Sequence, residues 1–347
     1  MSVEDPGSRC VEHMPSSRVL AFTDPYQYQV GIRGVDSVEV FPTAGGEFRA
    51  ELIQIDFDRL WIQRGQENLP RIIHAVVNKN RTGIEFPVSE NQAAFRHHGI
   101  NLVSGEIVAD DGQSTSRLSF GSCHWGGMSL RLEDLASRGR ALVGREITRP
   151  LAAHIIRPAP PLMERLLGLH SEAARLAKTG PDALAHPKVA RALEEALVHA
   201  MIQCLTEGTV IKTDSAKRHH TAIIAKLEEF LAANGTHPLY LTEICTATGV
   251  SESTLRRCCY EHLGMGPVRY LWLRRMHLAR LALLQADAAR ETVTGIATDH
   301  GFWELGRFSV QYRRLFGESP SASLHRLPSD RPAAQNRPFD LPATDFA

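Results

Sequence analysis

The sequence predicts a multidomain α+β protein with a β-rich N-terminal half and an all-α C-terminal third. Short alternating apolar runs, punctuated by Gly and Asn or Asp, occupy residues 25–150. A Pro-rich stretch at 150–161 separates these runs from two long amphipathic helical patterns. From residue 222 onward, one pattern of apolar residues and glycines occurs twice. For a chain of 347 residues, two or three domains are expected.

The alternating runs of residues 25–150 are typical of the short strands of a small sandwich or barrel. Apolar residues alternate from Phe48 to Leu52, and then in the opposite register from Ile53 to Phe57. This shift indicates a bulge or a strand end. Such a barrel can enclose an aromatic-lined cavity for one ligand, although no residue of that cavity can be named from the sequence.

The two helical patterns predict a helical segment over residues 151–206. Its second helix begins at Pro187 and carries an apolar stripe from Val189 to Cys204. That stripe suits either core packing or a dimer seam. Residues 207–220, with a glycine and a basic cluster, are expected to be an interdomain linker. Residues 1–24 and 327–347 are polar or Pro-rich and are expected to be loosely ordered tails.

The repeat in residues 221–326 predicts two helix-turn-helix units. Each copy has a short helix, a glycine turn at Gly249 or Gly301, a longer second helix, and a second glycine at Gly264 or Gly317. The turn glycines favour a positive φ, and a proline such as Pro320 starts the next helix. The connector from 267 to 286 spans about 30 Å as a helix. This is close to one turn of B-DNA, about 34 Å, so two second helices could enter successive major-groove faces.

The second helix of each unit has an outward face that suits DNA. Ser251 is a good N-cap for the first of them. Arginine can chelate guanine and glutamine can pair with adenine, so outward residues of these types are candidate base readers. The expected DNA-binding residues are Ser251, Ser253, Arg256, Arg257, Glu304, Arg307, Val310, Gln311, Arg313 and Arg314.

Residues 222–326 resemble the AraC/XylS family of transcription regulators. The resemblance lies in three segments, Val293–Ala297, Gly301–Phe308 and Phe316–Pro320. The form Leu305-Gly306-Arg307-Phe308 is most similar to the branch that contains XylS and the ethanolamine regulator.

This resemblance implies base-facing positions at Ser253, Arg256 and Arg257 and at Gly306, Arg307, Val310 and Gln311. Gly306 stands where many members carry a polar residue, and Val310 where an arginine is common, so little direct readout is expected from either. The resemblance also implies a cupin-like sensing domain at 25–150 and dimerisation through the helices of 160–206.

Composition excludes several other classes. Net charge is zero, although residues 217–326 carry a net +4, so a uniformly nucleic-acid-coating protein is not indicated. The six cysteines form no CxxC pair or zinc spacing, and no metal or cofactor is expected. His97 and His98 are adjacent, so in a strand they would point to opposite faces and could not share a metal. Because no signal peptide or membrane span is evident, a cytoplasmic protein is expected.

The function predicted from these observations is sequence-specific, ligand-responsive regulation of transcription, without enzymatic activity. Its expected partners are double-stranded DNA, a small-molecule effector, RNA polymerase and a second copy of the chain. One alternative is a regulator whose N-terminal domain binds another protein. A remote alternative is an enzyme fused to a DNA module, such as a repair protein with a methyl-accepting thiol, for which Cys123 is the candidate.

Overall fold

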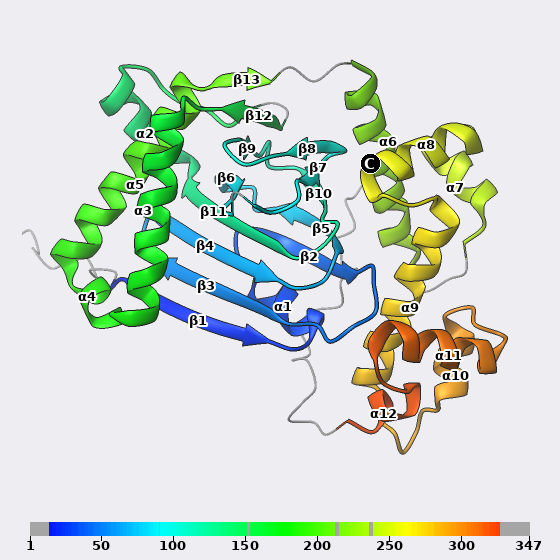
Figure 1. Cartoon of the computed structure of the whole chain (residues 1–347). Coiled ribbons are helices and arrows are strands. Elements are labelled where there is room, and N and C mark those ends of the chain that lie inside the picture. Colours follow the sequence, from blue (N-terminus) through cyan, green and yellow to red (C-terminus); the bar gives the residue numbers. More distant parts are fainter. Residues whose placement is uncertain (1–13, 90, 151–152, 212–214, 236–238, 327–347) are drawn as a thin grey trace, which may run out of the picture.

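Two antiparallel sheets form the N-terminal part of the computed structural model, which describes residues 14–89, 91–150, 153–211, 215–235 and 239–326 (Figure 1). The larger sheet contains, in spatial order, β1 (Ser16–Phe22), β3 (Ala50–Asp56), β4 (Leu60–Glu67), β11 (Cys123–Arg131), β6 (Arg81–Pro87), β9 (Ile107–Ala109), β12 (His154–Arg157) and β13 (Thr209–Ile211). The smaller sheet contains β2 (Val35–Pro42), β5 (Arg71–Val77), β10 (Ser114–Leu118), β7 (Phe95–His97) and β8 (Ile100–Leu102). The sheets pack as a sandwich rather than a closed barrel.

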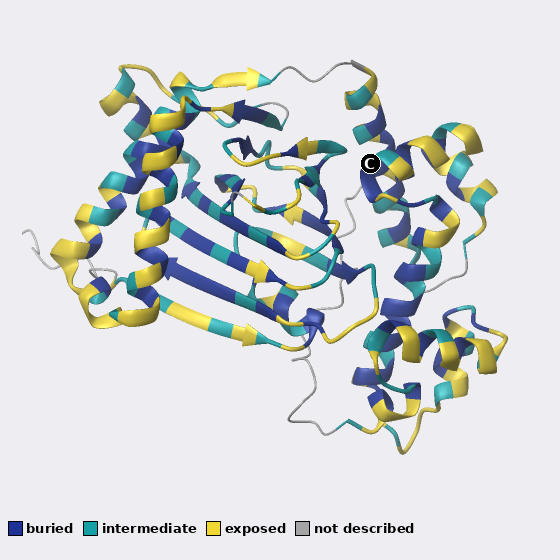
Figure 2. Ribbon diagram, in the orientation of Figure 1, coloured by how far each residue is buried: buried dark blue, intermediate teal, exposed yellow. Residues whose placement is uncertain are grey.

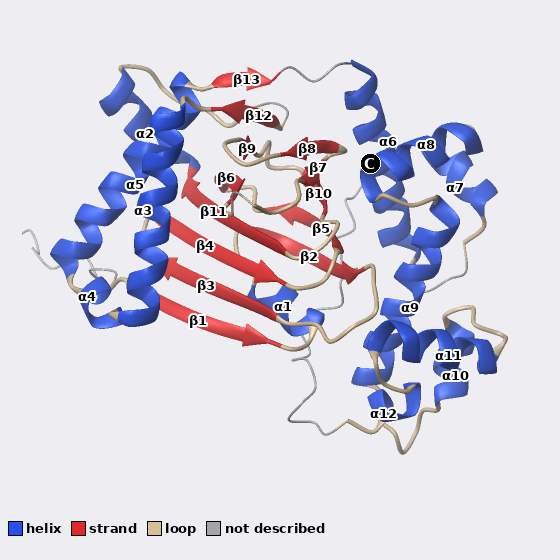
Figure 3. Cartoon of the chain, in the orientation of Figure 1, coloured by secondary structure: helices blue, strands red, loops and turns tan. Residues whose placement is uncertain are grey.

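Helices cover the outside of the larger sheet (Figure 3). The covering helices are α3 (Pro160–Thr179), α4 (Pro181–Ala185) and α5 (Pro187–Glu207), and α2 (Leu132–Val143) follows β11. A short helix, α1 (Pro25–Gly31), is capped by Asp24, whose carboxylate accepts a hydrogen bond from the Tyr26 amide at 2.8 Å. Helices α2 to α5 and the outer face of the larger sheet share one apolar core.

The expected bulge at Leu52 and Ile53 is wrong. Strand β3 pairs with β4 without a break in register from Ala50 to Asp56. Leu52 packs between the two sheets, whereas Ile53 and Ile55 pack against the helices. Because both faces of the strand are buried, it carries apolar residues in both registers. Figure 2 shows β3 buried along most of its length.

Several expected boundaries also differ from the structure. Residues 16–22 of the expected N-terminal tail form edge strand β1, and the rest of that tail up to residue 13 lies outside the described residues. β12 and β13 continue the larger sheet beyond residue 150, so part of the expected linker is a strand. Residues 215–220 of the expected linker begin a helix, and its residues 212–214 and the tail 327–347 lie outside the described residues.

The stripe on α5 is core packing. Leu197, Met201 and Cys204 are all buried within this chain, against α3 and the sheet. Val189, at the start of the stripe, is 41% exposed. These three buried side chains therefore do not form the dimer seam that the stripe also suited.

Seven helices make up the described C-terminal part: α6 (Ser215–Asn234), α7 (Leu241–Thr248), α8 (Glu252–Leu263), α9 (Pro267–Gln285), α10 (Val293–Asp299), α11 (Leu305–Phe316) and α12 (Pro320–Leu324). Their core also includes Ile72 and Leu118 of the smaller sheet. The outer face of that sheet is therefore the surface on which the helical part packs (Figure 1). No helix among the described residues is long and apolar enough to cross a membrane.

Candidate nucleic-acid interface

The first helix-turn-helix unit consists of α7 and α8. Between them, Gly249 adopts a left-handed conformation with φ of +72°. Ser251 then caps α8, and its hydroxyl accepts a hydrogen bond from the Thr254 amide at 3.3 Å. Gly264 ends α8 with φ of +69°. Helix α8 is anchored by its buried residues Leu255, Cys258, Cys259, His262 and Leu263.

The second unit consists of α10 and α11 and repeats this design with one difference. Gly301 has φ of +76° and Gly317 has φ of +74°, and Pro320 opens α12. Phe308 and Tyr312 anchor α11 in the core. Unlike Ser251, the N-cap residue Glu304 makes no side-chain capping hydrogen bond.

Helix α9 joins the two units and is buried along most of its length. Its side chains Tyr270, Met276 and Ala279 are fully buried in the core shared with both units. Pro267 stands in the first turn, where a missing N–H costs nothing. The relative position of α8 and α11 is therefore set by a packed helix rather than by a flexible linker.

The outward faces of α8 and α11 carry most of the candidate DNA-binding residues. On α8, a surface hollow is lined by Glu252, Ser253, Arg256, Arg257 and Tyr260. On and before α11, the exposed candidates are Glu304, Gly306, Arg307, Val310, Arg313 and Arg314. Both leading arginines are paired with an acid on the same helix turn. Arg256 lies 2.6 Å from Glu252, and Arg307 lies 3.8 Å from Glu304.

Gln311 is an exception among the expected outward residues. It is half-buried, and its Oε1 accepts a hydrogen bond from the indole N–H of Trp272 on α9 at 3.2 Å. The amide is therefore directed at the connector helix. Trp272 lies 39 residues earlier, so the spacing within α11 gave no sign of this contact.

The sequence reasoning missed the extensive contact between the helical part and the sandwich. Nε2 of His74 lies 2.9 Å from the hydroxyl of Tyr270, and Arg274 pairs with Glu39 at 3.3 Å. The hydroxyl of Tyr26 donates to the carbonyl of His277. The sequence did carry one sign of this contact, because α9 has charged residues at positions of its helical pattern where apolar residues are expected. Arg274 and Arg280 lie on the buried face of α9, 4% and 5% exposed.

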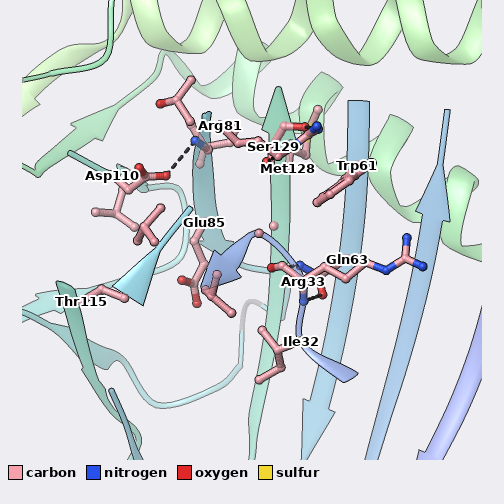
Figure 4. Close-up of a pocket in the computed structure, with 18 of the residues that line it drawn as sticks. Ile32, Arg33, Trp61, Gln63, Arg81, Glu85, Asp110, Thr115, Met128 and Ser129 are labelled. Carbon is pink, nitrogen blue, oxygen red and sulfur yellow. Dashed lines mark hydrogen bonds between the residues drawn. The ribbon is translucent and has the colours of Figure 1, made fainter. Parts of the chain in front are cut away.

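A cavity of about 100 Å³ lies between the two sheets (Figure 4). Trp61 and Trp125 contribute aromatic surface, and the guanidinium of Arg81 lies 3.8 Å from the centre of the Trp61 ring. Arg117 forms an ion pair with Glu85. Burial raises the pKa of Asp110 to about 6, although backbone hydrogen bonds from Gly83 and Gly112 oppose this. The lining thus combines aromatic surface with several charged groups.

His97 lines this cavity, but His98 does not occupy the opposite face of a strand. Strand β7 ends at His97, and His98 adopts a left-handed conformation with φ of +48°. This turns its ring back to 4.5 Å from the His97 ring, centre to centre. The expected opposite orientation is therefore wrong, because it assumed that the strand continues. Within the described part of the chain, no group of three or more His, Cys, Asp or Glu residues is arranged to hold a metal ion.

Comparisons with known proteins agree on the C-terminal part. Residues 244–326 match the family described as "Helix-turn-helix domain". A probable thc operon regulatory protein of Rhodococcus erythropolis is 34% identical over 149 residues, which cover 43% of this chain and 45% of that protein. The XylDLEGF operon transcriptional activator 2 of Pseudomonas putida is 30% identical over 104 residues, covering 29% of this chain and 66% of that protein.

The match to the Rhodococcus protein thus spans less than half of that relative's length. Among solved structures, the AraC-like transcriptional activator CuxR aligns with a TM-score of 0.40 at 16% identity, covering 80% of this chain and 97% of that one. The family match, residues 244–326, spans most of the two helix-turn-helix units and all of their connector. The C-terminal domain of this chain is therefore similar to the helix-turn-helix domains of AraC/XylS-type transcription regulators.

Proposed function

We propose that this protein is a transcription regulator that binds a two-part DNA site through α8 and α11. The observation that carries the proposal is the pair of helix-turn-helix units held by one buried helix, α9, with exposed arginines on both second helices. A 19-residue helix spans about 28 Å, which suits half-sites about one turn of DNA apart.

Within each second helix, base contact and phosphate contact fall to different residues. Ser253, Arg256 and Arg257 on α8, and Arg307 and Val310 on α11, are the proposed base-facing residues. Arg313 and Arg314 lie in the last turns of α11 and are proposed to hold phosphates. Gln311 can read a base only after it leaves Trp272, so we assign it a smaller share of the readout.

Selection of bound sites from random DNA by the full-length protein tests this function. The expected motif has two conserved blocks whose centres lie about 10 base pairs apart. Binding should weaken steeply as salt rises, because phosphate contacts release counterions. A folded protein that enriches no motif would overturn the proposal, and a single conserved block would overturn the use of both units.

A small molecule in the cavity between the sheets is the proposed regulator of this activity. The cavity is lined by polar and aromatic groups that could orient a ligand, and its volume of about 100 Å³ suits only a small one. A sensing domain that binds another protein instead would leave the cavity unused. Substitutions such as Ser129→Phe, which fill the cavity, would then not affect regulation.

The enzyme alternative finds no support in its candidate residue. Cys123 is buried, and burial raises the pKa of its thiol to about 12. A methyl-accepting or otherwise nucleophilic cysteine needs the opposite shift, toward the thiolate. The relatives described above are regulators rather than enzymes.

RNA polymerase and a second copy of the chain are further proposed partners, and the cytoplasm is the proposed location. The name of the Pseudomonas relative, a transcriptional activator, supports the polymerase contact. A dimer would have to use surfaces other than the buried stripe on α5. Sedimentation at micromolar concentration, with and without DNA, tests for it.

A further inference from the structure

The smaller, five-stranded sheet separates the cavity from the first helix-turn-helix unit. Its side chains contribute to both the cavity lining and the core of the helical part. On its inner face, Thr115 and Arg117 of β10 line the cavity. On its outer face, Leu118 of the same strand belongs to the core of the helical part. Successive residues of a strand point to opposite faces, so a single strand touches both compartments. A single layer of sheet therefore separates the cavity from the DNA-binding unit.

The turn between β7 and β8 lies between these two compartments and contacts both. Nε2 of His97 lies 2.9 Å from the Thr115 hydroxyl inside the cavity wall. His97 also pairs in register with Arg117. The two turn residues that follow, His98 and Gly99, have φ of +48° and +74°. The His98 ring rests on the His97 ring.

The same turn packs directly on α8. A Cβ added to Gly99 would lie only 2.8 Å from Nε2 of His262, so the turn backbone and this ring are in close contact. Next to the turn, Arg96 donates a hydrogen bond of 2.9 Å to the carbonyl of Glu261, at the C-terminal end of α8. Leu118 approaches Gly264, the residue that ends α8.

His262 is tightly enclosed at this contact. It is 1% exposed, and neither ring nitrogen has a hydrogen-bond partner among the described residues. Packed interiors transmit small displacements because they have little free volume. A shift of the turn must therefore move the His262 ring, and with it the last turns of α8. Arg256 and Arg257 lie one to two turns earlier on that helix.

We propose that the His97–His98–Gly99 turn couples the cavity to the first DNA-binding unit. His97 and Thr115 respond to what occupies the cavity, and His98 and Gly99 pass the change to His262 and the C-terminal end of α8. This inference rests on the proposed function, since the cavity is taken there as the regulatory site. In this proposal the coupling runs through the smaller sheet and not through the larger one.

Amide hydrogen exchange of the full-length protein, without DNA or ligand, tests the coupling. Thr115→Val keeps the shape of the side chain but removes the bond to His97. We expect exchange in residues 258–264 to become about fivefold faster, as follows from the loss of one hydrogen bond. Ser129→Ala is the matched control, because it removes one hydrogen bond, from Nε of Arg81, at the wall of the same cavity on the larger sheet. It should leave residues 258–264 unchanged.

His98→Ala should speed exchange in the same segment, and the double variant Thr115→Val/His98→Ala should be no faster than the faster single variant. Three results would each overturn the coupling. They are unchanged exchange in α8 of Thr115→Val, an equal effect of Ser129→Ala on α8, and effects of Thr115→Val and His98→Ala that multiply in the double variant. Exchange in β4 of the larger sheet serves as the internal reference. If Thr115→Val speeds exchange in β4 as much as in α8, the coupling would also be overturned. Because DNA is absent, failure of DNA binding would be a separate result.

Discussion

Asp24 and Arg280 form a buried ion pair, with 2.9 Å between a carboxylate oxygen and a guanidinium nitrogen. Asp24 precedes the first helix of the sandwich, and Arg280 lies near the end of α9. Arg280 also contacts Glu318 at 3.1 Å, beyond the second helix-turn-helix unit. This cluster ties the sandwich, the connector and the second unit together.

Asp24→Asn should therefore lower the free energy of unfolding by about 2 kcal/mol, as expected when one partner of a buried pair is removed but a second partner remains. The asparagine can still cap α1, so the loss reports the ion pairs of Asp24 with Arg280 and, at 3.8 Å, with Arg326. Urea unfolding of the full chain measures it. Asp287→Asn is the control, because its pair with Arg290 is exposed, and it should cost less than about 1 kcal/mol. Equal losses would show that the Asp24 pair contributes no more than a surface pair.

The difference between base readers and phosphate binders should appear in selected DNA sites. Arg307→Ala should cost about 1–3 kcal/mol and remove the preference at one base pair of one half-site. Arg256→Ala should do the same in the other half-site. Both arginines must first leave the acidic partners Glu304 and Glu252. If the sites selected by Arg307→Ala have the same motif and information content as those of the wild type, the proposed placement of α11 in the groove is wrong.

Arg314→Ala provides the contrasting result. Its side chain is exposed in the last turn of α11, where the helix would leave the groove. We expect the selected motif to stay unchanged while all sequences bind more weakly. The slope of affinity against salt concentration should fall by about one, corresponding to one lost phosphate contact. A changed motif would reassign Arg314 to base readout.

The sequence predicts the helix-turn-helix units well because their determinants are local. Glycine turns, caps and apolar spacing within about twenty residues specify each unit, as Gly249 and Ser251 illustrate. The partner of Asp24 is more than 250 residues away, so no local pattern indicates it. Strand β1 was missed for another reason. It is an edge strand with mostly exposed residues, and it therefore lacks the apolar alternation of a half-buried strand.

Buried histidines should make the junction of sandwich and helices sensitive to acid. Burial lowers the pKa of His74 and of His98 to about 4, and that of His262 to about 3. A histidine with a lowered pKa binds fewer protons in the folded chain than in the unfolded one. Its contribution to stability is complete above pH 6.5 and is lost as the pH falls toward 4. For His74 alone, the loss at pH 5 is about 2 kcal/mol.

One neighbouring group works in the opposite direction. Burial raises the pKa of Glu228 to about 7, so protonation of this carboxyl favours the folded chain as the pH falls from 7 to 5. The other charged or titratable groups that face these histidines are Glu39, Arg96, Asp111, His220, Tyr270 and Arg274. Asp110 in the cavity, whose pKa burial raises to about 6, acts in the same direction as Glu228. Because three histidines oppose these two carboxyls, we expect a net loss of stability at pH 5.

Urea unfolding at pH 7 and pH 5 measures this loss. His74→Gln cannot titrate and should reduce the difference between the two pH values by about 2 kcal/mol. His186→Gln, at an exposed histidine, should leave the difference as it is in the wild type. A wild-type stability that rises on acidification would mean that the carboxyls with raised pKa, Glu228 and Asp110, outweigh the histidines.

Helix α5 offers a direct test of core packing against a dimer seam. Leu197 is fully buried between α5 and the larger sheet, whereas Val189 on the same helix is 41% exposed. Leu197→Glu buries a charge and should destabilise the sandwich by at least about 3 kcal/mol. Val189→Glu should leave stability within about 0.5 kcal/mol. A Leu197→Glu protein that dissociates but keeps the stability of its sandwich would restore the seam interpretation.

The last prediction concerns the isolated DNA-binding part. A fragment of residues 212–326 retains α6 whole, whereas a start at Lys217 would remove the first residues of that helix. Both helix-turn-helix units and their connector remain, so the fragment should bind the motif selected by the full chain. However, it exposes the face of α9 that carries Tyr270, Arg274 and His277, which the sandwich covers in the full chain. We therefore expect a less soluble fragment with the same motif and salt dependence, measured by fluorescence anisotropy on labelled DNA. Retained solubility with no affinity would mean that the sandwich supplies part of the DNA-binding surface.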